Sequence, residues 1–596
     1  MSFQMAAARM QRMAEAIGRR IARSLPRPKL SPAQLAAASP QTLKSIVARS
    51  GLFDARYYLA QLAGDRETVR DPVAHYLAEG ESQGRMPNPV FDPAWYRQAA
   101  GAALPEKGSP LAHYVLSGSG EGRETGPDFD AGYYRKAHAD VAAAGIEPMR
   151  HYLEFGRYEG RAATAASKNA LFRHFDITRH DRLGPLASPT GSSGRLPLSE
   201  MAEGMRGRGR QVLLHILHSS GGGTERHVAD LARSLPDVSH LVLAPRRTGG
   251  IFELSVLVPE DGGWRRADIS TERFADVAPL LRQFGVSRVH VHHAVEVIDG
   301  IEAFLAGIAA PYDLTLHDYS LICPRMSLVR DGQYCGEPDE SGCRSCLSRQ
   351  PTPHGRDIVA WRGFGTSLLR NADRVICPTI DVATRLRRYV PDARIVVAPH
   401  EAELYHPAGL APWRAADPVE QLRVAVIGAC AEHKGGAFLL DCIEQARAAR
   451  SPVSWTAIGF FPGSLAGRAR DFRDVLDVTG PYDGARVGDM IQRTDPHVIF
   501  FPQHCVETYS YSLSEALASR RQILAPRIGP FAERLAGIEG ARLYNVTDSP
   551  AEVVEVLRGL RPGAKPPPFQ TPPGLEPDLG FYQSDYLHPR QDRNRS

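Results

Sequence analysis

The sequence predicts an α/β protein with two doubly wound domains, preceded by an all-α module of helical repeats. Between about residues 211 and 560, short apolar runs alternate with helix-length segments, which is typical of parallel sheets covered on both faces. Upstream of them, a set of residue pairs recurs at a fixed interval, which indicates repeats. At 596 residues the chain is too long for one hydrophobic core, so we expect several domains.

The composition argues against several classes of protein, namely nucleic-acid-binding, membrane-spanning and disulfide-rich proteins. With 43% hydrophobic and 23% charged residues, the chain can form packed cores, and its net charge of +4 gives no basis for binding nucleic acid. We find no apolar run near the ~20 residues of a membrane span and no signal peptide. Eight cysteines are too few for a disulfide scaffold of this length and fit reduced thiols. We therefore expect a cytoplasmic protein.

The first segment, residues 1–45, has a basic amphipathic pattern. Met10, Met13, Ile17 and Ile21 recur at spacings of three and four, and arginines occupy the rest of the helical surface. Such a helix either lies on an anionic membrane surface or is a solvated terminal helix. Residues 1–163 are therefore where we expect any contact with the inner membrane or with another protein.

Residues 46–163 are predicted to be three helical repeats of 38 residues, each with two short helices and a turn. A Phe-Asp pair, a His-Tyr pair and a Gly-Arg pair each recur three times, beginning at 53, 91 and 129, at 75, 113 and 151, and at 84, 122 and 160. Because the His-Tyr pair is present in every unit, we interpret it as packing residues with hydrogen-bonded polar tips, not as ligands.

Composition changes again after the repeats. Residues 164–210 are rich in Ser, Gly, Pro and Arg and are predicted to be a linker. Strand-like runs then begin, and their restart near Leu422 separates a domain over 211–415 from one over 416–562, with a Pro-rich tail over 563–596. The expected strands are Gln211–Leu217, His240–Ala244, Arg288–His292, Tyr312–Leu316, Arg374–Cys377, Leu422–Ile427, Ser454–Ile458, His497–Phe501, Gln522–Ala525 and Arg542–Asn545. Ligands of such sheets bind at the carboxyl ends of the strands, so we expect the site between the two lobes.

Four motifs carry a resemblance to a known family. They are "SSGGGTERHVADLARSL" (219–235), "LTLHDYSLICPR" (314–325), "IGACAEHKGG" (427–436) and "FFPQHCVETYSYSLSEALASRRQILAPRIGPFAERL" (500–535). With them, residues 211–560 resemble retaining glycosyltransferases of family four, which have the GT-B fold of two Rossmann-like domains. The 38-residue units resemble modules fused to bacterial polysaccharide glycosyltransferases.

The resemblance implies a reaction and its substrates. A sugar would pass, with retention of its anomeric configuration, from a nucleoside-diphosphate donor to a polysaccharide of the cell surface, such as lipopolysaccharide, or to a lipid-linked glycan. The donor would bind the second domain and the acceptor the first. No cofactor and no divalent metal would take part in catalysis.

By the same resemblance, two glutamates would grip the donor, with Glu507 facing the sugar and Glu515 the ribose hydroxyls. Eight residues of helix rise ~12 Å, so a glutamate before a helix and another inside it could reach both ends of a nucleotide sugar. The backbone N–H groups of 509–512 would point at the diphosphate, where a helix N-terminus favours negative charge. The expected donor-binding residues are Glu515, Lys434, Tyr509, Ser510, Tyr511, Ser512, Gly222 and Gly223.

Lys434 is the expected cation at the leaving group. It follows Gly428 by six residues, in the loop after the first strand of the second lobe, where a positive charge would stabilise the departing diphosphate. The alternative is a solvated lysine. Ala429 stands where many relatives have arginine, and His433 and Arg527 are the candidates to replace that clamp.

In the first lobe, Gly222 and Gly223 follow a strand and would let the backbone approach a ligand closely. His317, which precedes Asp318, resembles the histidine that lies near the reacting sugar in this family. Its alternative is a turn-forming His-Asp pair. The expected catalytic residues are therefore Glu507, His317 and Lys434.

Two groups of residues could instead bind metal. Alternation places His290 and His292 on one face of a strand, where they either ligate a metal or are buried, and we favour burial. Four cysteines in a loop-rich stretch either form a structural zinc site or are independent thiols, and they are Cys323, Cys335, Cys343 and Cys346.

A second function class remains open. A GT-B protein that has lost catalysis could be retained as a glycan-binding or assembly scaffold, and Ala429 is the residue that favours it.

Overall fold

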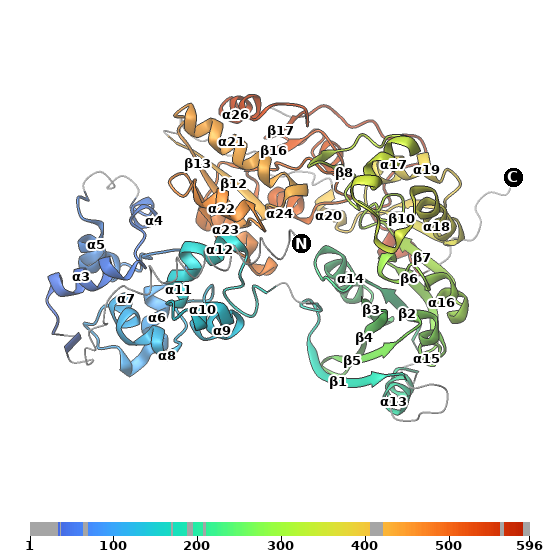
Figure 1. Ribbon diagram of the computed structural model, residues 1–596, viewed down its shortest axis with the longest axis horizontal. Coiled ribbons are helices and arrows are strands. Elements are labelled where there is room, and N and C mark those ends of the chain that lie inside the picture. Colours follow the sequence, from blue (N-terminus) through green and yellow to red (C-terminus); the bar gives the residue numbers. More distant parts are fainter. Residues whose placement is uncertain are drawn as a thin grey trace. The chain divides into compact units, whose positions relative to one another are not determined.

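The structure is a computed structural model, and it describes residues 34–35, 37–62, 69–168, 171–186, 195–206, 210–405, 421–560 and 566–587 (Figure 1). The amphipathic pattern over residues 10–21 lies outside them. The chain divides into two compact units. Unit 1 is Met1–Lys168 with Gly428–Cys430 and Trp455–Arg493, and unit 2 is Asn169–Ile427 with Ala431–Ser454 and Thr494–Ser596. The predicted fold class is confirmed, because parallel α/β sheets follow a helical module.

Unit 1 begins with helices that start at aspartate or proline. An aspartate side chain caps the first helix of each 38-residue unit, and a proline at the first turn begins the second helix. Each second helix continues into one wide π turn that ends at glycine. The helices are α3 (Pro40–Ser50), α4 (Ala55–Ala60), α5 (Pro72–His75), α6 (Pro93–Ala100), α7 (Pro110–His113), α8 (Ser119–Glu121), α9 (Ala131–Ala137), α10 (Ala139–Ala143), α11 (Pro148–His151) and α12 (Arg157–Glu159), and the π turns are Tyr76–Gly80, Tyr114–Gly118 and Tyr152–Gly156.

A tyrosine–histidine hydrogen bond recurs in these helices at intervals of 38 residues. It joins a tyrosine hydroxyl on the first helix to the histidine Nδ1 on the second, for Tyr58–His75 (2.7 Å), Tyr96–His113 (2.8 Å) and Tyr134–His151 (2.9 Å). The same hydroxyl lies against the glycine of the following π turn, where a Cβ atom would overlap it. The interpretation of these histidines as packing residues with a satisfied polar tip is therefore confirmed.

The repeats pack against a segment that the sequence analysis assigned to the domain over 416–562. Within unit 1, the Tyr152 hydroxyl donates to the Thr479 carbonyl (2.8 Å), and Arg56 pairs with Asp477 (2.8 Å). Asp128 accepts from two arginines of the segment. The elements there are β13 (Val453–Phe460), β14 (Leu476–Val478), α22 (Leu465–Arg470) and α23 (Val487–Thr494), and β13 pairs in parallel with β14.

Unit 2 begins with a sheet that has nine strands among the described residues, in the order β1-β5-β4-β3-β2-β6-β7-β10-β11. The strands predicted over 211–377 are all present. The sheet was predicted to be parallel, whereas β4 is antiparallel to both of its neighbours, β3 and β5. The bounds are β1 (Ile177–Pro185), β2 (Val212–Ile216), β3 (Ser239–Thr248), β4 (Ile251–Glu260), β5 (Gly263–Thr271), β6 (Val286–Val291), β7 (Tyr312–Thr315), β10 (Arg374–Cys377) and β11 (Ile395–Val397). A separate hairpin joins β8 (Val329–Arg330) and β9 (Gln333–Tyr334).

The helices of this part of unit 2 pack around the sheet, with a core rich in Val, Leu, Ile and Phe (Figure 1). They are α13 (Arg195–Arg206), α14 (Gly223–Ser234), α15 (Ala278–Arg282), α16 (Ile301–Ile308), α17 (Glu340–Arg349), α18 (Ile358–Asn371), α19 (Ile380–Tyr389) and α20 (Ala402–Tyr405).

The prediction of a linker over 164–210 is wrong for much of that stretch. Strand β1 adds to the sheet beside β5, and α13 buries Leu198 and Met201 in the core. Most side chains of β1 are exposed, since it is an edge strand, so few apolar residues mark it.

The C-terminal tail also has a packed part. Arg374 donates to the carbonyls of Asp585 and Tyr586, and Phe581 and Tyr582 are buried beside the first sheet.

The second sheet of unit 2 contains parallel strands in the order β12-β15-β16-β17. Its strands are β12 (Leu422–Ala429), β15 (Val498–Phe500), β16 (Gln522–Pro526) and β17 (Ala541–Tyr544), as predicted, and its helices are α21 (Gly436–Ala448), α24 (Tyr511–Ser519), α25 (Pro530–Arg534) and α26 (Pro550–Arg558). No helix in the described part of the chain combines the length and the apolar character needed to span a bilayer.

Candidate functional site

The start of α24 has an unusual backbone. Ser510, the residue before the helix, has φ +67°, a left-handed conformation that costs energy for a residue with a side chain. Arg534, which is fully buried, holds it by donating to the carbonyls of Tyr509 (2.8 Å) and Ser510 (3.0 Å). The Ser510 side chain does not cap the helix, and its hydroxyl lies 3.2 Å from that of Ser512. The helix N-terminus can therefore offer its N–H groups to an anion.

Lys434 and Glu507 form an ion pair beside this loop, with 3.4 Å between Nζ and Oε1. The lysine side chain is 44% exposed and that of the glutamate 13%, so the cation reaches solvent while its partner does not. Gly435 follows with φ +76° and packs against the Pro502 carbonyl, where a Cβ atom would overlap. The glycine thus lets the loop that carries Lys434 approach the strand end before Glu507.

Glu515 makes an ion pair that the sequence analysis missed. Arg226 Nη1, from α14, lies 3.3 Å from Glu515 Oε1, and Arg226 Nη2 lies 2.8 Å from Glu401 Oε1. The guanidinium also stacks 4.5 Å from the ring centroid of Tyr511, the first residue of α24. Arg226 lies inside the motif over 219–235, but no local pattern there indicates a partner in the other lobe.

Burial raises the pKa of Glu515 to about 7, while Arg226 lowers it and Glu401 raises it. The desolvation of the carboxylate therefore outweighs its attraction to the guanidinium. Near neutral pH this side chain is divided between its charged and neutral forms.

His317 lies next to the loop of Glu507. The Thr508 hydroxyl donates to the His317 carbonyl (2.7 Å), and the His317 ring stacks on His400 with 5.0 Å between centroids. On the glycine loop, a Cβ at Gly223 would lie 3.2 Å from the Tyr511 ring, whereas one at Gly222 would meet nothing within 4 Å. The structure thus brings Gly223, His317 and the start of α24 into one neighbourhood.

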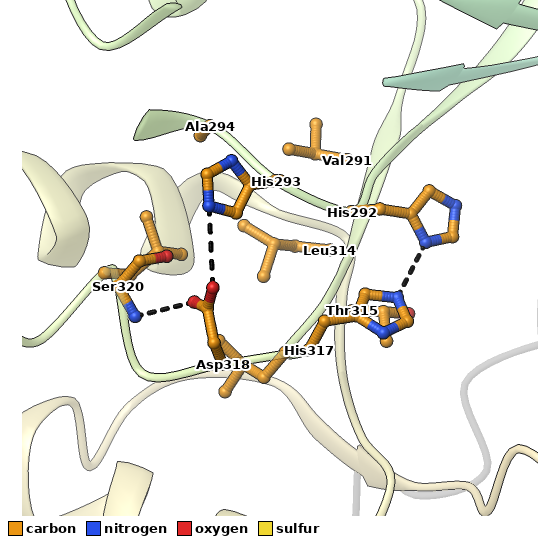
Figure 2. A pocket seen from close by; sticks show the side chains of 11 residues that line it. Val291, His292, His293, Ala294, Leu314, Thr315, His317, Asp318 and Ser320 are labelled. Atoms are coloured by element: carbon orange, nitrogen blue, oxygen red, sulfur yellow. Dashed lines mark hydrogen bonds and ion pairs between the residues drawn. The ribbon is translucent and has the colours of Figure 1, made fainter. Parts of the chain in front are cut away.

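Asp318 has a different environment from its neighbour. It accepts from the Ser320 backbone N–H (2.8 Å) and pairs with His293 (3.5 Å), in a small pocket at the ends of β6 and β7 (Figure 2). Burial opposes its charge, but the His293 hydrogen bond brings the pKa of Asp318 down to about 2. The alternative for His317 and Asp318 was a turn-forming pair, and Asp318 does form such a turn with Ser320. The charge of Asp318 therefore has a structural role here.

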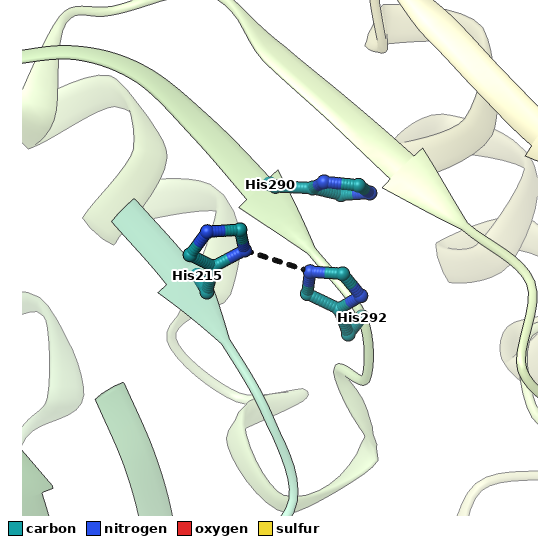
Figure 3. Close-up of side chains that lie close together, drawn as sticks. All are labelled: His215, His290 and His292. Carbon is teal, nitrogen blue, oxygen red and sulfur yellow. Dashed lines mark hydrogen bonds between the residues drawn. The ribbon is translucent and has the colours of Figure 1, made fainter. Parts of the chain in front are cut away.

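The histidines considered as metal ligands are buried and hydrogen-bonded to other groups. His290 and His292 share a face, with 3.9 Å between ring centroids, and His290 bonds to Thr315 (2.7 Å) and Tyr586 (2.6 Å) (Figure 3). Two trios bring their ligand atoms within 4.8 Å of one another, namely His215, His290 and His292, and His227, His292 and His317. Both nitrogens of His290 and of His292 are already occupied by hydrogen bonds, so burial is the interpretation that fits.

The four cysteines lie in one neighbourhood, where burial and, to a lesser extent, Cys335, Cys343 and Cys346 raise the pKa of Cys323. None of Cys323, Cys335, Cys343 and Cys346 belongs to a metal-ligating trio among the described residues, and none forms a disulfide. Burial raises the pKa of the Cys323 thiol to about 11, and Arg362 donates to Cys343 Sγ (3.3 Å). The zinc site and the independent thiols, which are the two alternatives for these cysteines, both stay predictions.

Comparison with known proteins gives one family. Residues 221–400 match the family model of Glycosyltransferase Family 4. A search of curated proteins finds no match.

Solved structures show weaker likeness. The Anabaena protein HepE in complex with UDP-glucose is 12% identical, with a TM-score of 0.39 over 59% of this chain and 89% of HepE. The catalytic domain of Starch Synthase IV from Arabidopsis thaliana, bound to ADP and acarbose, is 12% identical, with a TM-score of 0.38 over 59% of this chain and 92% of that domain.

Proposed function

We propose that the chain transfers a sugar from a nucleoside-diphosphate donor, with retention of its anomeric configuration, on the premise that residues 221–400 match the family model of Glycosyltransferase Family 4. The acceptor is a polysaccharide of the cell surface or a lipid-linked glycan. The observation that carries the donor assignment is the uncapped, strained start of α24, which has a cation and carboxylates beside it.

Each residue of this neighbourhood has a chemical role in the proposal. The N–H groups at the start of α24, with the hydroxyls of Ser510 and Ser512, bind the diphosphate. Lys434 stabilises the charge that develops on the diphosphate as the sugar leaves, so that no divalent metal is needed for this step. Glu507 orients Lys434 and accepts from a sugar hydroxyl, and Glu515 accepts from the ribose.

Arg226 supports the same proposal from the first lobe. The Ala429 side chain has no donor for a phosphate, and burial lowers the pKa of His433, which disfavours the charged form of that ring. Arg226 already lies over Tyr511 at the start of α24 and carries a permanent charge. We therefore assign to Arg226 part of the role of the absent arginine.

A thermal shift panel on the full chain tests the donor assignment. We expect one of UDP, GDP and ADP to raise the Tm, since a ligand at 100 times its Kd stabilises by about 2.7 kcal/mol. Glu515→Ala and Lys434→Ala should reduce the shift, whereas Lys136→Ala, on the exposed surface of α9, should leave it unchanged. If no nucleotide shifts the Tm of the unsubstituted chain, the donor site is wrong.

The second candidate is a scaffold without catalysis, which Ala429 favours. Such a protein would release no sugar from any nucleotide-sugar donor, with or without acceptor. Hydrolysis of one donor by the purified chain, lost in Lys434→Ala, would exclude it.

A further inference from the structure

Four histidines form a continuous hydrogen-bonded chain across the first sheet of unit 2. His240 Nδ1 lies 2.9 Å from His215 Nε2, His215 Nδ1 lies 3.0 Å from His292 Nε2, and His292 Nδ1 lies 3.0 Å from His317 Nε2. Figure 3 shows the second of these bonds and Figure 2 the third. Each histidine comes from or directly follows a different strand, in the order β3, β2, β6 and β7, which is the order of those strands in the sheet.

His240, at one end of the four histidines, determines the direction in which all of their hydrogen bonds run. His240 Nε2 lies 3.2 Å from the carbonyl oxygen of Leu235, and a carbonyl can only accept. His240 must therefore carry its proton on Nε2 and accept at Nδ1 from His215. The same reasoning passes through His215 and His292, so each of the four rings donates from Nε2. His317 then has a proton on Nε2 and a lone pair on Nδ1.

The direction of these hydrogen bonds holds for neutral rings, each with a single proton. Burial lowers the pKa of His240 to about 4 and holds those of His215, His292 and His317 well below the usual range. Neighbouring histidines lower the pKa of His215, His292 and His317 further. At neutral pH, one proton per ring gives one consistent direction along the chain.

His317, at the other end of the four histidines, has a ring nitrogen that is available to a ligand. His317 is partly exposed, and among the described residues its Nδ1 has no hydrogen-bond partner, although its backbone carbonyl accepts from Thr508. The ring lies two residues beyond β7, at the edge where parallel strands present their ligand sites. A nitrogen that can accept, and that has no partner in the described ranges, therefore lies in the neighbourhood assigned to the donor.

We propose that His240, His215 and His292 are positioning residues, which lock His317 in the tautomer with the proton on Nε2 and so present Nδ1 as an acceptor to a hydroxyl of the bound sugar. The identity of the sugar partner rests on the proposed function, whereas the tautomer of His317 does not. The four hydrogen-bonded histidines thus connect the orientation of His317 to the backbone carbonyl of Leu235, three strands away.

The tautomer can be measured directly on the full chain. Magic-angle-spinning NMR with ¹⁵N at both ring nitrogens of histidine separates protonated from unprotonated nitrogen, and the signals lost in His317→Gln identify His317. We expect His317 to show an unprotonated Nδ1 at pH 7. A protonated Nδ1 in the unsubstituted chain would overturn the proposal, whether or not the protein binds nucleotides.

Two substitutions of the central histidine separate positioning from packing. His215→Gln keeps an oxygen that can accept from His292, so His317 should keep its tautomer. His215→Phe removes that acceptor, so His292 can donate from Nδ1 instead, and His317 should become a mixture of both tautomers. His290→Phe removes an equally buried histidine that is not one of the four hydrogen-bonded histidines, and it should leave the tautomer of His317 unchanged.

Activity then tests the sugar contact. We expect kcat/KM to fall about 10-fold in His215→Phe and to stay near the original value in His215→Gln and His290→Phe. If His215→Phe mixes the tautomers but leaves kcat/KM unchanged on a donor that the protein turns over, then Nδ1 does not contact the sugar. Loss of activity in all three variants alike would show that the histidines act through packing alone.

Discussion

Arg226 Nη1 lies 3.3 Å from Glu515 Oε1, although 289 residues separate them in the sequence. This ion pair joins α14, which follows the glycine loop of the first lobe, to α24, which follows the loop of Glu507. Glu401 contacts the same guanidinium, so one cation serves two carboxylates. Because burial raises the pKa of Glu515 to about 7, the charge of this ion pair changes near neutral pH.

We predict that Glu515→Gln becomes more stabilising, relative to the unsubstituted chain, as the pH rises from 5 to 8. The folded-state pKa of Glu515 is about 7 against an ordinary value of 4.5. Below pH 4.5 the carboxyl is protonated in both states. Between 4.5 and 7 the unfolded chain releases the proton first, which costs about 3 kcal/mol of stability by pH 7. Glutamine does not titrate and avoids this loss.

The measurement is the difference in Tm between the two proteins at pH 5, 6, 7 and 8, which cancels other titrating groups. We expect a small difference at pH 5, of about 1 kcal/mol or less, and several degrees in favour of the variant at pH 8. A difference that turns against the variant at high pH would mean that Arg226 stabilises the carboxylate more than burial disfavours it.

Lys434→Ala should reduce kcat by about 10²- to 10³-fold, because it removes a positive charge that acts as the diphosphate departs. Its Tm should change little, since an ion pair with a 44% exposed lysine contributes less than about 1 kcal/mol. Steady-state kinetics with a nucleotide-sugar donor, beside a melting curve, measure both effects. An unchanged kcat would remove Lys434 from the catalytic assignment.

Gly118→Ala should destabilise the repeats by about 1–3 kcal/mol, because the new methyl group would overlap the Tyr96 hydroxyl. Gly120 lies two residues away with nothing within 4 Å of an added Cβ. Gly120→Ala is therefore the matched control and should leave stability unchanged or raise it by up to about 1 kcal/mol. Urea unfolding followed by circular dichroism compares them. Equal effects from both would contradict the tight tyrosine–glycine packing.

Tyr586→Phe should cost about 1–3 kcal/mol, because it leaves His290 Nδ1 buried without its partner at 2.6 Å. Tyr57→Phe is the comparison and should change stability little, since the Tyr57 hydroxyl donates to the Met86 sulfur at 3.7 Å, which is a weak acceptor. Thermal unfolding of both variants gives the result. If Tyr586→Phe is neutral, the tail does not depend on this hydrogen bond for its attachment.

Much of the fold could be predicted from local patterns. Buried strands such as 212–216 are short apolar runs, and alternation correctly placed His290 and His292 on one face. The recurrence of His and Tyr every 38 residues correctly indicated a packing role. In these cases the signal lies within a few residues of the position concerned.

Other features could not be predicted from local sequence patterns. The edge strand β1 is mostly exposed and has the composition of a linker, because an edge strand needs few apolar residues. The partnership of Arg226 with Glu515 depends on which elements of two sheets fold next to each other.

The sequence by itself determined where the buried parallel strands such as β2 and β7 lie, how the repeats are spaced and which motifs carry the family resemblance, because hydrophobic periodicity and turn residues act locally. Only the tertiary structure decided that His240, His215, His292 and His317 would meet. They are spread over 103 positions of the chain, from His215 to His317. Strand order in the sheet, which no local pattern encodes, places them side by side.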